Sequence, residues 1–255
     1  MLTCSALTVS VAGRSLVRNL TFNLTPGDVI CLLGPNGVGK TLTLHTLAGL
    51  RPPGEGSIRL GGDDLTRLRR RQIAQQLGLL LQDDAETFPA TALGTVLMGR
   101  HPHLGNGATE SPSDVQRARD ALSVMNLAGL DDRLVATLSG GERRRLAMAR
   151  LLTQDPDILL LDEPVNHLDP RHQIDTLEHI SALAQSGRGV IMTLHDPSLA
   201  MRFASHALLL FSDGTWVLDK TRAALTPENL VRLFGIPYDE YVNARGETAL
   251  LPGRP

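Results

Sequence analysis

The sequence predicts an α/β fold with a mainly parallel β-sheet, because short apolar runs alternate with amphipathic helical patterns. The runs lack the polar alternation of a half-solvated strand, so each is predicted to be a strand buried on both faces. They are Val29–Leu33, Leu79–Leu81, Ile158–Leu161, Val190–Leu194 and Ala207–Leu210. With 255 residues, the chain can bury a sizeable core in one large domain or in a core with a subdomain.

Helices with clear start signals are predicted between these strands. Asp169-Pro170 is typical of a helix N-terminus, because aspartate caps the backbone and proline fits the first turn. Apolar residues then recur at helical spacing until Gly187, which is predicted to end that helix. Ser113-x-x-Gln116 has the form of a capping box and predicts the start of another helix.

Residues 83–137 interrupt the alternation of strands and helices. They contain no convincing buried strand, many small and polar residues, and a predicted loop at Gly105–Ser113. We therefore expect a mostly helical insertion. The tail from Thr226 onward predicts a short helix followed by irregular or edge-strand structure.

The composition is that of an ordinary soluble protein, with 42% apolar residues and a net charge of −2. Such a charge does not favour a nucleic-acid or anionic lipid surface. Neither a signal peptide nor an apolar run of the roughly 20 residues needed to span a membrane is expected. Cys4 and Cys31 provide no disulfide framework, Cys31 is expected to be a buried thiol, and a reducing compartment is the simplest interpretation.

The first predicted strand leads into a glycine-rich loop. Gly34 to Thr41 reads G-P-N-G-V-G-K-T and matches G-x-x-x-x-G-K-[ST], a phosphate-binding loop, with a strand before it and a helix start after it. The glycines let backbone N–H groups approach phosphates, and the helix that begins near Lys40 adds its positive end. The chain has only two lysines, Lys40 and Lys220. Lys40 is predicted to contact the β- and γ-phosphates. Thr41 is predicted to supply a hydroxyl to Mg²⁺, so the chain is predicted to bind a nucleotide.

Polar side chains follow three further strands. Gln82, the pair Asp162-Glu163 and His195 each stand where an apolar run ends. Ligands bind at the carboxyl edge of open α/β sheets, so these residues are expected to gather near the phosphate loop. Asp162 is predicted to bind Mg²⁺ through water, and Glu163 to orient and polarise an attacking water. Gln82 and His195 could reach the Mg²⁺, the water or the γ-phosphate.

A second glycine-containing motif reads Leu138-Ser-Gly-Gly-Glu142. Ser139 and Glu142 form a capping box, which explains a helix start but not two successive glycines. Glycines are poor helix formers, yet they let the backbone approach an anion closely. The motif therefore predicts a second anion site at a capped helix N-terminus.

In combination, these motifs resemble those of ATP-binding-cassette (ABC) ATPases in order and spacing. The motifs are the phosphate loop, Gln82, Leu138–Glu142, Ile158–Glu163, Asn166–Asp169 and His195. The resemblance covers essentially the whole chain. It implies a P-loop NTPase (RecA-like) core with a mainly parallel sheet, an N-terminal antiparallel β region and a helical ABC subdomain. Within this single nucleotide-binding domain, the core is expected at about residues 1–82 and 150–225, the helical subdomain at about 83–149 and a C-terminal tail at 226–255.

The resemblance also implies a head-to-tail homodimer that hydrolyses ATP with Mg²⁺. Each ATP would lie between the phosphate loop of one subunit and the signature motif, Leu138–Glu142, of the other. The implied ATP-binding residues of one chain are Gly34, Pro35, Asn36, Gly37, Val38, Gly39, Lys40, Thr41, Leu42 and Val11. Those implied to contact the ATP held by the second subunit are Ser139, Gly140, Gly141 and Glu142.

Further roles are carried over to matching positions of this sequence. The implied catalytic residues are Glu163, His195, Gln82 and Lys40. Glu163 would be the base, and His195 would hold the γ-phosphate and the attacking water. The implied Mg²⁺ ligands are Thr41, Gln82 and Asp162, and Asp169 would link the two sites across the interface. The sequence departs from the family at Val11, where an aromatic residue usually stacks on adenine. We therefore expect weaker or less selective recognition of the base.

The resemblance places the chain on the cytoplasmic face of a membrane as a peripheral subunit. Its partners would be a separate polytopic permease and, indirectly, a periplasmic or surface solute-binding protein. Candidates for the permease-facing surface are Phe88, Pro89, Met98, Arg100 and Leu104. The stretches "ALGTVLMGRHPHLG" and "FGIPYDEY…GETALLP" resemble importers of iron chelates, haem and cobalamin.

Other classes of function were weighed on the same sequence. A GTPase would need an N-K-x-D motif, and Asn166–Asp169 lacks the lysine. The arginines Arg67, Arg69–Arg71 and Arg143–Arg145 could serve a nucleic-acid ATPase, but solvated helix faces are the favoured interpretation in a near-neutral chain. Two alternatives stay open: an ABC ATPase of another transporter, with a different solute or working in export, and a non-transport ABC ATPase that acts on nucleic acid or the ribosome. His101-x-His103 is favoured as a plain loop pair, without a metal.

Overall fold

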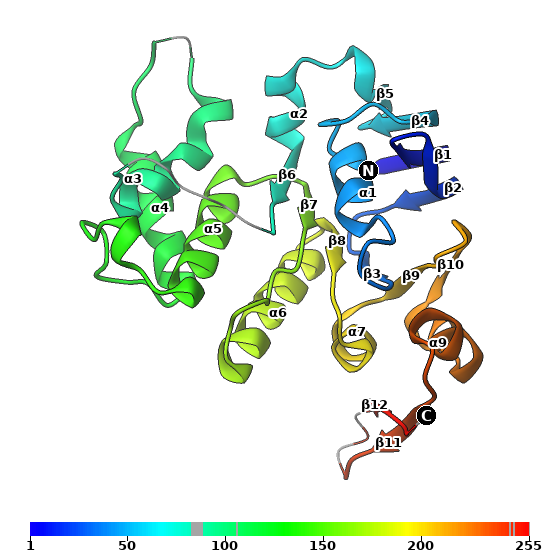
Figure 1. Cartoon of the computed structure of the whole chain (residues 1–255). Helices are drawn as coiled ribbons and strands as arrows, with labels where there is room; N and C mark the ends of the chain where they lie inside the picture. Colours follow the sequence, from blue (N-terminus) through cyan, green and yellow to red (C-terminus); the bar gives the residue numbers. More distant parts are fainter. Residues whose placement is uncertain (83–88, 106, 245, 247, 255) are drawn as a thin grey trace.

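The computed structural model describes residues 1–82, 89–105, 107–244, 246 and 248–254. A six-stranded sheet with the order β10-β9-β3-β8-β7-β6 lies at its centre (Figure 1). Its strands are β3 (Val29–Leu33), β6 (Leu77–Leu80), β7 (Ile158–Leu161), β8 (Gly189–Thr193), β9 (His206–Leu210) and β10 (Trp216–Lys220). All pairs are parallel except β9–β10 at the edge. The predicted α/β fold and its five buried strands are thus confirmed, with boundaries shifted by at most two residues.

A second, antiparallel sheet covers one side of the central sheet and confirms the expected N-terminal β region. Its order is β2-β1-β4-β5, from β1 (Leu2–Val11), β2 (Arg14–Leu24), β4 (Glu55–Leu60) and β5 (Asp63–Asp64). Strands β1 and β2 form a hairpin whose two connecting residues, Ala12 and Gly13, both have positive φ. This backbone matches the twist of tight hairpins, so it fixes the register that pairs Val11 with Arg14.

The insertion after β6 is helical in its described part, as predicted. It contains α3 (Ala92–Leu97), the 3₁₀ turns η2 (Met98–His103) and η3 (Val135–Thr137), α4 (Pro112–Val124) and α5 (Gly140–Gln154). The remaining helical elements of the core are α1 (Lys40–Leu47), η1 (Leu65–Arg67), α2 (Arg70–Gln76), α6 (Pro170–Gln185) and α7 (Pro197–Phe203). The boundary expected near residue 149 falls inside α5, which continues to Gln154.

The predicted capping box at Ser113 and Gln116 is wrong by two residues. The cap is Ser111, whose hydroxyl accepts from the backbone N–H of Asp114, while the Asp114 carboxylate accepts from the N–H of Ser111. Pro112 decides the register, because its fixed φ suits the first helical position and it lacks the N–H that position leaves unpaired. Ser113 therefore lies within the first turn. By contrast, the predicted cap of α6 by Asp169, followed by Pro170, is confirmed.

The tail follows its predicted pattern of a short helix and edge strands. It comprises α8 (Thr221–Ala224), α9 (Pro227–Phe234) and the hairpin of β11 (Tyr238–Val242) and β12 (Thr248–Pro252). Figure 1 shows this hairpin beyond α7, at the end of the molecule away from the antiparallel sheet. The Ser198 hydroxyl of α7 bonds to the backbone of Leu250 and ties the hairpin to the core.

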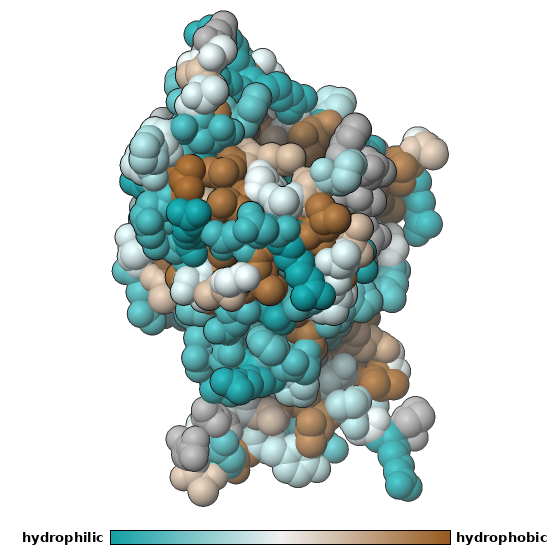
Figure 2. Space-filling model, turned by 90° about the vertical axis from the view of Figure 1, so that its left-hand side faces the viewer, coloured by the Kyte–Doolittle hydropathy of each residue, from teal (hydrophilic) through white to brown (hydrophobic). Residues whose placement is uncertain are grey.

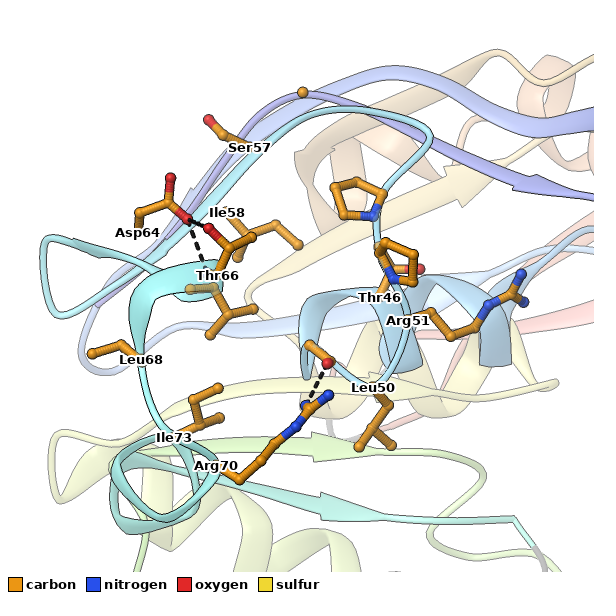
Figure 3. A pocket seen from close by; sticks show the side chains of 15 residues that line it. Thr46, Leu50, Arg51, Ser57, Ile58, Asp64, Thr66, Leu68, Arg70 and Ile73 are labelled. Atoms are coloured by element: carbon orange, nitrogen blue, oxygen red, sulfur yellow. Dashed lines mark hydrogen bonds between the residues drawn. The ribbon is translucent and has the colours of Figure 1, made fainter.

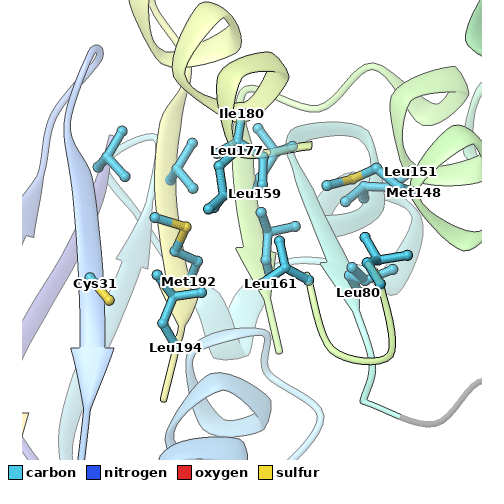
Figure 4. Packing of buried hydrophobic residues seen from close by; sticks show 14 of the residues in the cluster. Cys31, Leu80, Met148, Leu151, Leu159, Leu161, Leu177, Ile180, Met192 and Leu194 are labelled. Atoms are coloured by element: carbon cyan, nitrogen blue, oxygen red, sulfur yellow. The ribbon is translucent and has the colours of Figure 1, made fainter. Parts of the chain in front are cut away.

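Two hydrophobic clusters lie on opposite faces of the central sheet. Strand β3 sends Cys31 and Leu33 into one cluster and Ile30 and Leu32 into the other. The first cluster runs from β3 through β7 and β8 to the helices, and Figure 4 shows these side chains packed together. It includes buried residues of α3, α4 and α5, so the helical subdomain shares a continuous core with one face of the sheet. Among the described residues, no helix is both long and apolar enough to cross a membrane.

Candidate ATP-hydrolysis site

The phosphate loop lies between β3 and α1, where its glycines permit a shape that other residues do not. Gly37 and Gly39 have φ values of +79° and +109°, in the left-handed region that glycine tolerates. A Cβ atom on Gly34 would lie 2.8 Å from the Leu210 carbonyl oxygen, so this glycine is needed for close packing. Helix α1 has no side-chain cap and no acidic residue in its first turn. Its N-terminal N–H groups therefore form a cradle suited to an anion.

Lys40 sits folded back into this loop. Its Nζ donates to the carbonyl oxygens of Gly34 and Pro35, at 2.8 and 3.2 Å, and the residue is only 7% exposed. Burial lowers the pKa of Lys40, an effect that the nearby Glu163 and Asp162 partly offset. The ammonium group is thus held at the loop, where a phosphate could replace the carbonyl oxygens as its partner.

Asp162 lies at the end of β7 and is almost fully buried. Its Oδ1 accepts a hydrogen bond of 2.7 Å from the Thr193 hydroxyl, while Oδ2 has no hydrogen-bond partner among the described residues. An ionised oxygen that is buried without a partner is costly unless a cation or water satisfies it. The carboxylate is therefore suited to a divalent cation at this position.

Glu163 is the most heavily constrained side chain of the site. Its Oε1 lies 2.6 Å from His195 Nε2, and its Oε2 accepts from the amides of Gln82 and Asn166, at 3.1 and 2.9 Å. Its backbone adopts a φ of +49°, which is uncommon outside glycine and marks a strained position. Because an ionised carboxylate only accepts hydrogen bonds, its contact with His195 places a proton on Nε2.

Several of these groups, though not Asp162, face one cavity of about 370 Å³. It is lined by Asn36, Gly37, Gly39, Lys40, Thr41, Leu42, Gln82, Glu163 and His195. The sheet topology explains this meeting, since β3, β6, β7 and β8 are parallel and their carboxyl ends share one edge. The predicted gathering of polar strand ends beside the phosphate loop is therefore what the structure shows.

The signature residues form the predicted capping box at the start of α5. Ser139 Oγ accepts from the N–H of Glu142 at 3.2 Å, and Glu142 Oε2 accepts from the N–H of Ser139 at 2.7 Å. The hydrogen bond from the Ser139 N–H is the main reason that the pKa of Glu142 is lowered. Ser139 and Gly140 are exposed, and a Cβ on Gly140 would meet open space. None of these residues lines the 370 Å³ cavity of the same chain, as far as the described residues go.

Asp169 is engaged at the start of α6. One carboxylate oxygen accepts from the N–H of His172 at 3.0 Å, and the other lies 2.7 Å from its Nδ1. These hydrogen bonds, the backbone one first, lower the pKa of Asp169. The carboxylate is still largely exposed, so it is accessible on the surface beside the signature helix.

The remaining predicted positions are Val11 and the candidates for a permease-facing surface. Val11 is 40% exposed at the end of β1 and does not line the cavity. Phe88 lies outside the described residues, whereas Pro89 and Met98 are exposed. Arg100 is turned inward, where it forms a 2.8 Å ion pair with Asp114 and donates to the carbonyl of Thr153. It is therefore a structural residue of the helical subdomain and not part of an exposed docking surface.

The arginines after the signature also depart from the expected solvated face. Arg143 is exposed and Arg145 is half-buried, but Arg144 is only 7% exposed. The helix period of α5 places successive side chains on different faces, and Arg144 is the one that faces the strand ends. His103, part of the histidine pair, bonds to the carbonyl of Gln154 at 2.8 Å, and no cluster of three or more metal-binding side chains occurs among the described residues.

Three residues important to this geometry were not predicted as site residues. Thr193 donates to Asp162 and also accepts from the N–H of Glu163 at 2.7 Å, so one hydroxyl positions both acids. Asn166 holds Glu163 through its amide. Arg144 contacts the backbone at the ends of β6 and β7. The sequence carries a signal only for Asn166, which belongs to the motif after the acidic pair; Thr193 and Arg144 look like ordinary strand and helix residues.

A second cavity, of about 350 Å³, lies at the C-terminal end of α1, whereas the phosphate loop lies at its N-terminal end (Figure 3). It is formed where η1 and α2 pack below the loop that follows α1, and Arg70 closes it by donating to the carbonyl of Gly49. Thr66 is fixed at its rim by two hydrogen bonds to Asp64. Its lining contains a single acid, Asp64, and no amide or imidazole side chain, so nucleotide hydrolysis is assigned to the first cavity.

A phosphate loop, paired acids at a parallel strand end and a histidine on the neighbouring strand define a P-loop nucleotide hydrolase. Comparison with known proteins is in agreement, because the family model described as ABC transporter matches residues 17–166. The chain therefore belongs to the ABC transporter family, and it is an ATPase subunit of that family.

Several relatives are similar over most of the chain. The hemin import ATP-binding protein HmuV of Gloeobacter violaceus is 37% identical over 243 residues, which cover 92% of this chain and 88% of that protein. The cobalamin import ATP-binding protein BtuD of Halobacterium salinarum is 34% identical over 90% of this chain and 58% of its own length. A solved structure described as a metal-chelate type ABC transporter in an inward-facing conformation has a TM-score of 0.87 and 31% identity, covering 99% of this chain and 97% of that one.

Proposed function

We propose that this chain is the ATP-hydrolysing subunit of an importer that takes up a metal chelate through a separate membrane permease. The observation that carries the ATPase part is the Glu163 carboxylate, held by Gln82, Asn166 and His195 over the phosphate loop. The import part is supported by the similarity to proteins named for hemin and cobalamin import and to a metal-chelate type transporter.

In this proposal, the phosphate loop binds the triphosphate of ATP. The N–H groups at the start of α1 and the Lys40 ammonium surround the β- and γ-phosphates and offset their charge. Mg²⁺, which neutralises phosphate charge when bound, would be held by Thr41 and Gln82, with Asp162 reaching it through water. The buried, unpartnered Oδ2 of Asp162 and the hydroxyl of Thr41 fit the oxygen ligands that this ion prefers.

Glu163 orients the attacking water. The water oxygen forms a bond to the γ-phosphorus, the bond to the leaving ADP oxygen breaks, and a proton of the water moves toward the carboxylate. His195 keeps the carboxylate in place with a proton on Nε2, and it is half-exposed, so it can also contact the γ-phosphate. Gln82 donates to the Glu163 carboxylate and would be a ligand of the metal ion near the attacking water.

The active unit in this proposal is a head-to-tail homodimer. The N-terminus of α5, with Ser139, Gly140 and Gly141, offers an anion site. As far as the described residues show, this site does not line the phosphate cavity of the same chain. It would contact the γ-phosphate of the ATP bound to the second subunit. Asp169, exposed beside it, would link the two sites across the interface.

The permease is proposed to contact the helical subdomain. Figure 2 views the molecule from that side and shows apolar patches among polar side chains. Met98 is 55% exposed there, and Pro89 is exposed as well. The subunit would thus lie at the cytoplasmic face of a membrane, and a periplasmic or surface binding protein would deliver the solute to the permease. Genes for a permease and such a binding protein beside this gene would support import, and neighbouring genes of another process would count against it.

The ATPase and the dimer can be tested with Glu163→Gln. The parent is expected to hydrolyse ATP only with Mg²⁺, and the variant to lose at least about 100-fold in rate, because the base is removed while the amide keeps its shape. The variant should then accumulate as an ATP-bound dimer, measured by light scattering after size exclusion. Glu178→Gln, which makes the same change on the exposed face of α6, is the control and should keep the parental rate. Continued turnover by Glu163→Gln, or a strict monomer with ATP, would contradict the proposal.

A further inference from the structure

Arg144 is a buried cation whose hydrogen bonds converge on the catalytic strand ends. It lies on the second turn of α5 and is 7% exposed. Its Nη1 donates to the carbonyl oxygens of Leu81 and Gln82, the latter at 3.2 Å. Its Nη2 donates to the carbonyl oxygens of Asp162 and Glu163, the latter at 2.7 Å. One guanidinium group therefore joins the backbone at the end of β6 to the backbone at the end of β7.

These four carbonyl groups lie beyond the last ladder pair of β6 and β7. Strands β6 and β7 pair only as far as Leu80 and Leu161, and one further bond runs from the N–H of Asp162 to the carbonyl of Leu80. Beyond that point, the backbone segments that follow β6 and β7 diverge and place Gln82 and Glu163 around the cavity. The Glu163 carbonyl also accepts from the N–H of Asn166 at 3.1 Å, whereas those of Leu81, Gln82 and Asp162 depend more on the guanidinium group. A buried carbonyl that loses its donor is costly.

The planar fork of arginine suits this position better than other cations. Two nitrogens on opposite sides of one rigid group serve two strand ends at once. A lysine ammonium has the same charge, but it is a point donor and cannot span both strands in one fixed geometry. The fork thus sets the separation of the backbone segments that carry the Gln82 amide and the Glu163 carboxylate, whose side chains are themselves 3.1 Å apart.

We propose that Arg144 is a positioning residue for ATP hydrolysis, which holds Gln82 and Glu163 in register by clamping the ends of β6 and β7. The inference rests on the proposed ATPase function. Among the described residues, Arg144 does not line the cavity, and its hydrogen bonds to Gln82 and Glu163 go to their carbonyl oxygens, so it acts through the backbone of the catalytic residues. Because it belongs to the signature helix, the clamp also fixes α5 against the strand ends of its own chain.

The test is Arg144→Lys, which keeps the buried charge but removes the fork, with Arg143→Lys as the matched control on the exposed face. A displacement of about 1 Å in a catalytic group can cost on the order of 100-fold in rate, so kcat of Arg144→Lys is expected to fall at least about tenfold. Binding of trinitrophenyl-ATP without Mg²⁺ should change less than about threefold, because the phosphate loop is untouched. Arg143→Lys should match the parent in both measurements.

A double-mutant cycle separates positioning from a general loss of structure. If Arg144 acts through Gln82, Arg144→Lys should cost much less in kcat in a Gln82→Ala background than in the parent. An equal fold-loss in both backgrounds, or a kcat within about twofold of the parent, overturns the inference.

Hydrogen exchange provides a readout that does not depend on activity. Peptides that span residues 77–82 and 158–164 should exchange faster in Arg144→Lys than in the parent or in Arg143→Lys, while peptides of β3 and α1 should not change. Unchanged exchange at both strand ends overturns the clamp even if the parent proves inactive. A parent without Mg²⁺-dependent ATPase activity, with faster exchange in Arg144→Lys, would instead contradict the proposed function and leave the clamp in place.

Discussion

At the scale of single residues, the site depends on Thr193, whose hydroxyl serves both acids at once. It accepts from the N–H of Glu163 and donates to Asp162, so one oxygen of Asp162 is satisfied and the other is left free. This division prepares the Asp162 carboxylate for a cation without leaving its whole charge unpaired in the interior. The residue is fully buried.

Val11 gives a prediction at the same scale. It is 40% exposed at the end of β1, and we propose that it matches the position where the family places an aromatic ring against adenine. Val11→Tyr should tighten ATP binding by about 2- to 10-fold, since aromatic stacking contributes about 0.5–1.5 kcal/mol. It should also raise the preference for ATP over GTP. Titration with both nucleotides measures this, and equal affinity and selectivity in the parent and the variant would show that the base is recognised elsewhere.

At the scale of elements, α4 and η2 are joined by a buried ion pair. Asp114 of α4 accepts from the hydroxyl and N–H of Ser111 and from Arg100, which also donates to the end of α5. One carboxylate thus caps its own helix and connects it to two other elements of the helical subdomain. The Ser111 hydroxyl is the main cause that lowers the pKa of Asp114 to about 2, followed by the Ser111 N–H and Arg100.

A pH dependence follows from this depressed pKa. The stabilisation that the ionised Asp114 carboxylate gives the fold is fully present above the ordinary pKa of aspartate, near pH 4. It is lost as the pH falls toward the lowered pKa of Asp114, about 2. Asp114→Asn should therefore be less stable than the parent at pH 7, and the gap should narrow below about pH 4. Urea unfolding at a series of pH values measures the gap. Asp120→Asn, on the exposed side of the same helix, is the control for the loss of stability at neutral pH. A difference in stability between Asp114→Asn and the parent that stays constant with pH would argue against a role of the Arg100–Asp114 ion pair.

At the scale of the whole molecule, two cores share one sheet. Cys4 belongs to the cluster beneath the antiparallel sheet and Cys31 to the cluster that reaches the helical subdomain. Both side chains are fully buried. Burial raises the pKa of Cys4 to about 12 and raises that of Cys31 as well, so neither thiol forms the reactive thiolate in the folded state.

The two thiols therefore report on the cooperativity of the fold. Neither should react with a maleimide at neutral pH in the folded protein, and both should react at once in urea. If the two clusters unfold together, Cys4 and Cys31 should be labelled at the same rate at intermediate urea concentrations, measured by mass spectrometry of the peptides. Labelling of Cys4 well before Cys31 would show that the antiparallel sheet opens by itself.

Much of this fold and site could be predicted because the signals are local. A glycine-rich loop after a buried strand and acids at a strand end are encoded within a few residues, and the structure places Lys40, Gln82, Glu163 and His195 around one cavity. The errors arose where neighbouring signals competed. Ser113 and Ser111 both resemble caps, and Pro112 decided between them. Arg143 and Arg144 look alike in the sequence, and only the rotation of α5 against the sheet buries one of them.

The sequence by itself determined the class of chemistry, because the shape of a phosphate loop and the capping of a helix depend on residues that are adjacent in the chain. It also determined the alternation of strands and helices through apolar periodicity. Only the tertiary structure decided which groups complete the site. Thr193 lies 31 positions from Asp162, and Arg144 lies 62 positions from Gln82. Their roles depend on the order of parallel strands and on the orientation of α5, which packing of the whole core sets and no local pattern records.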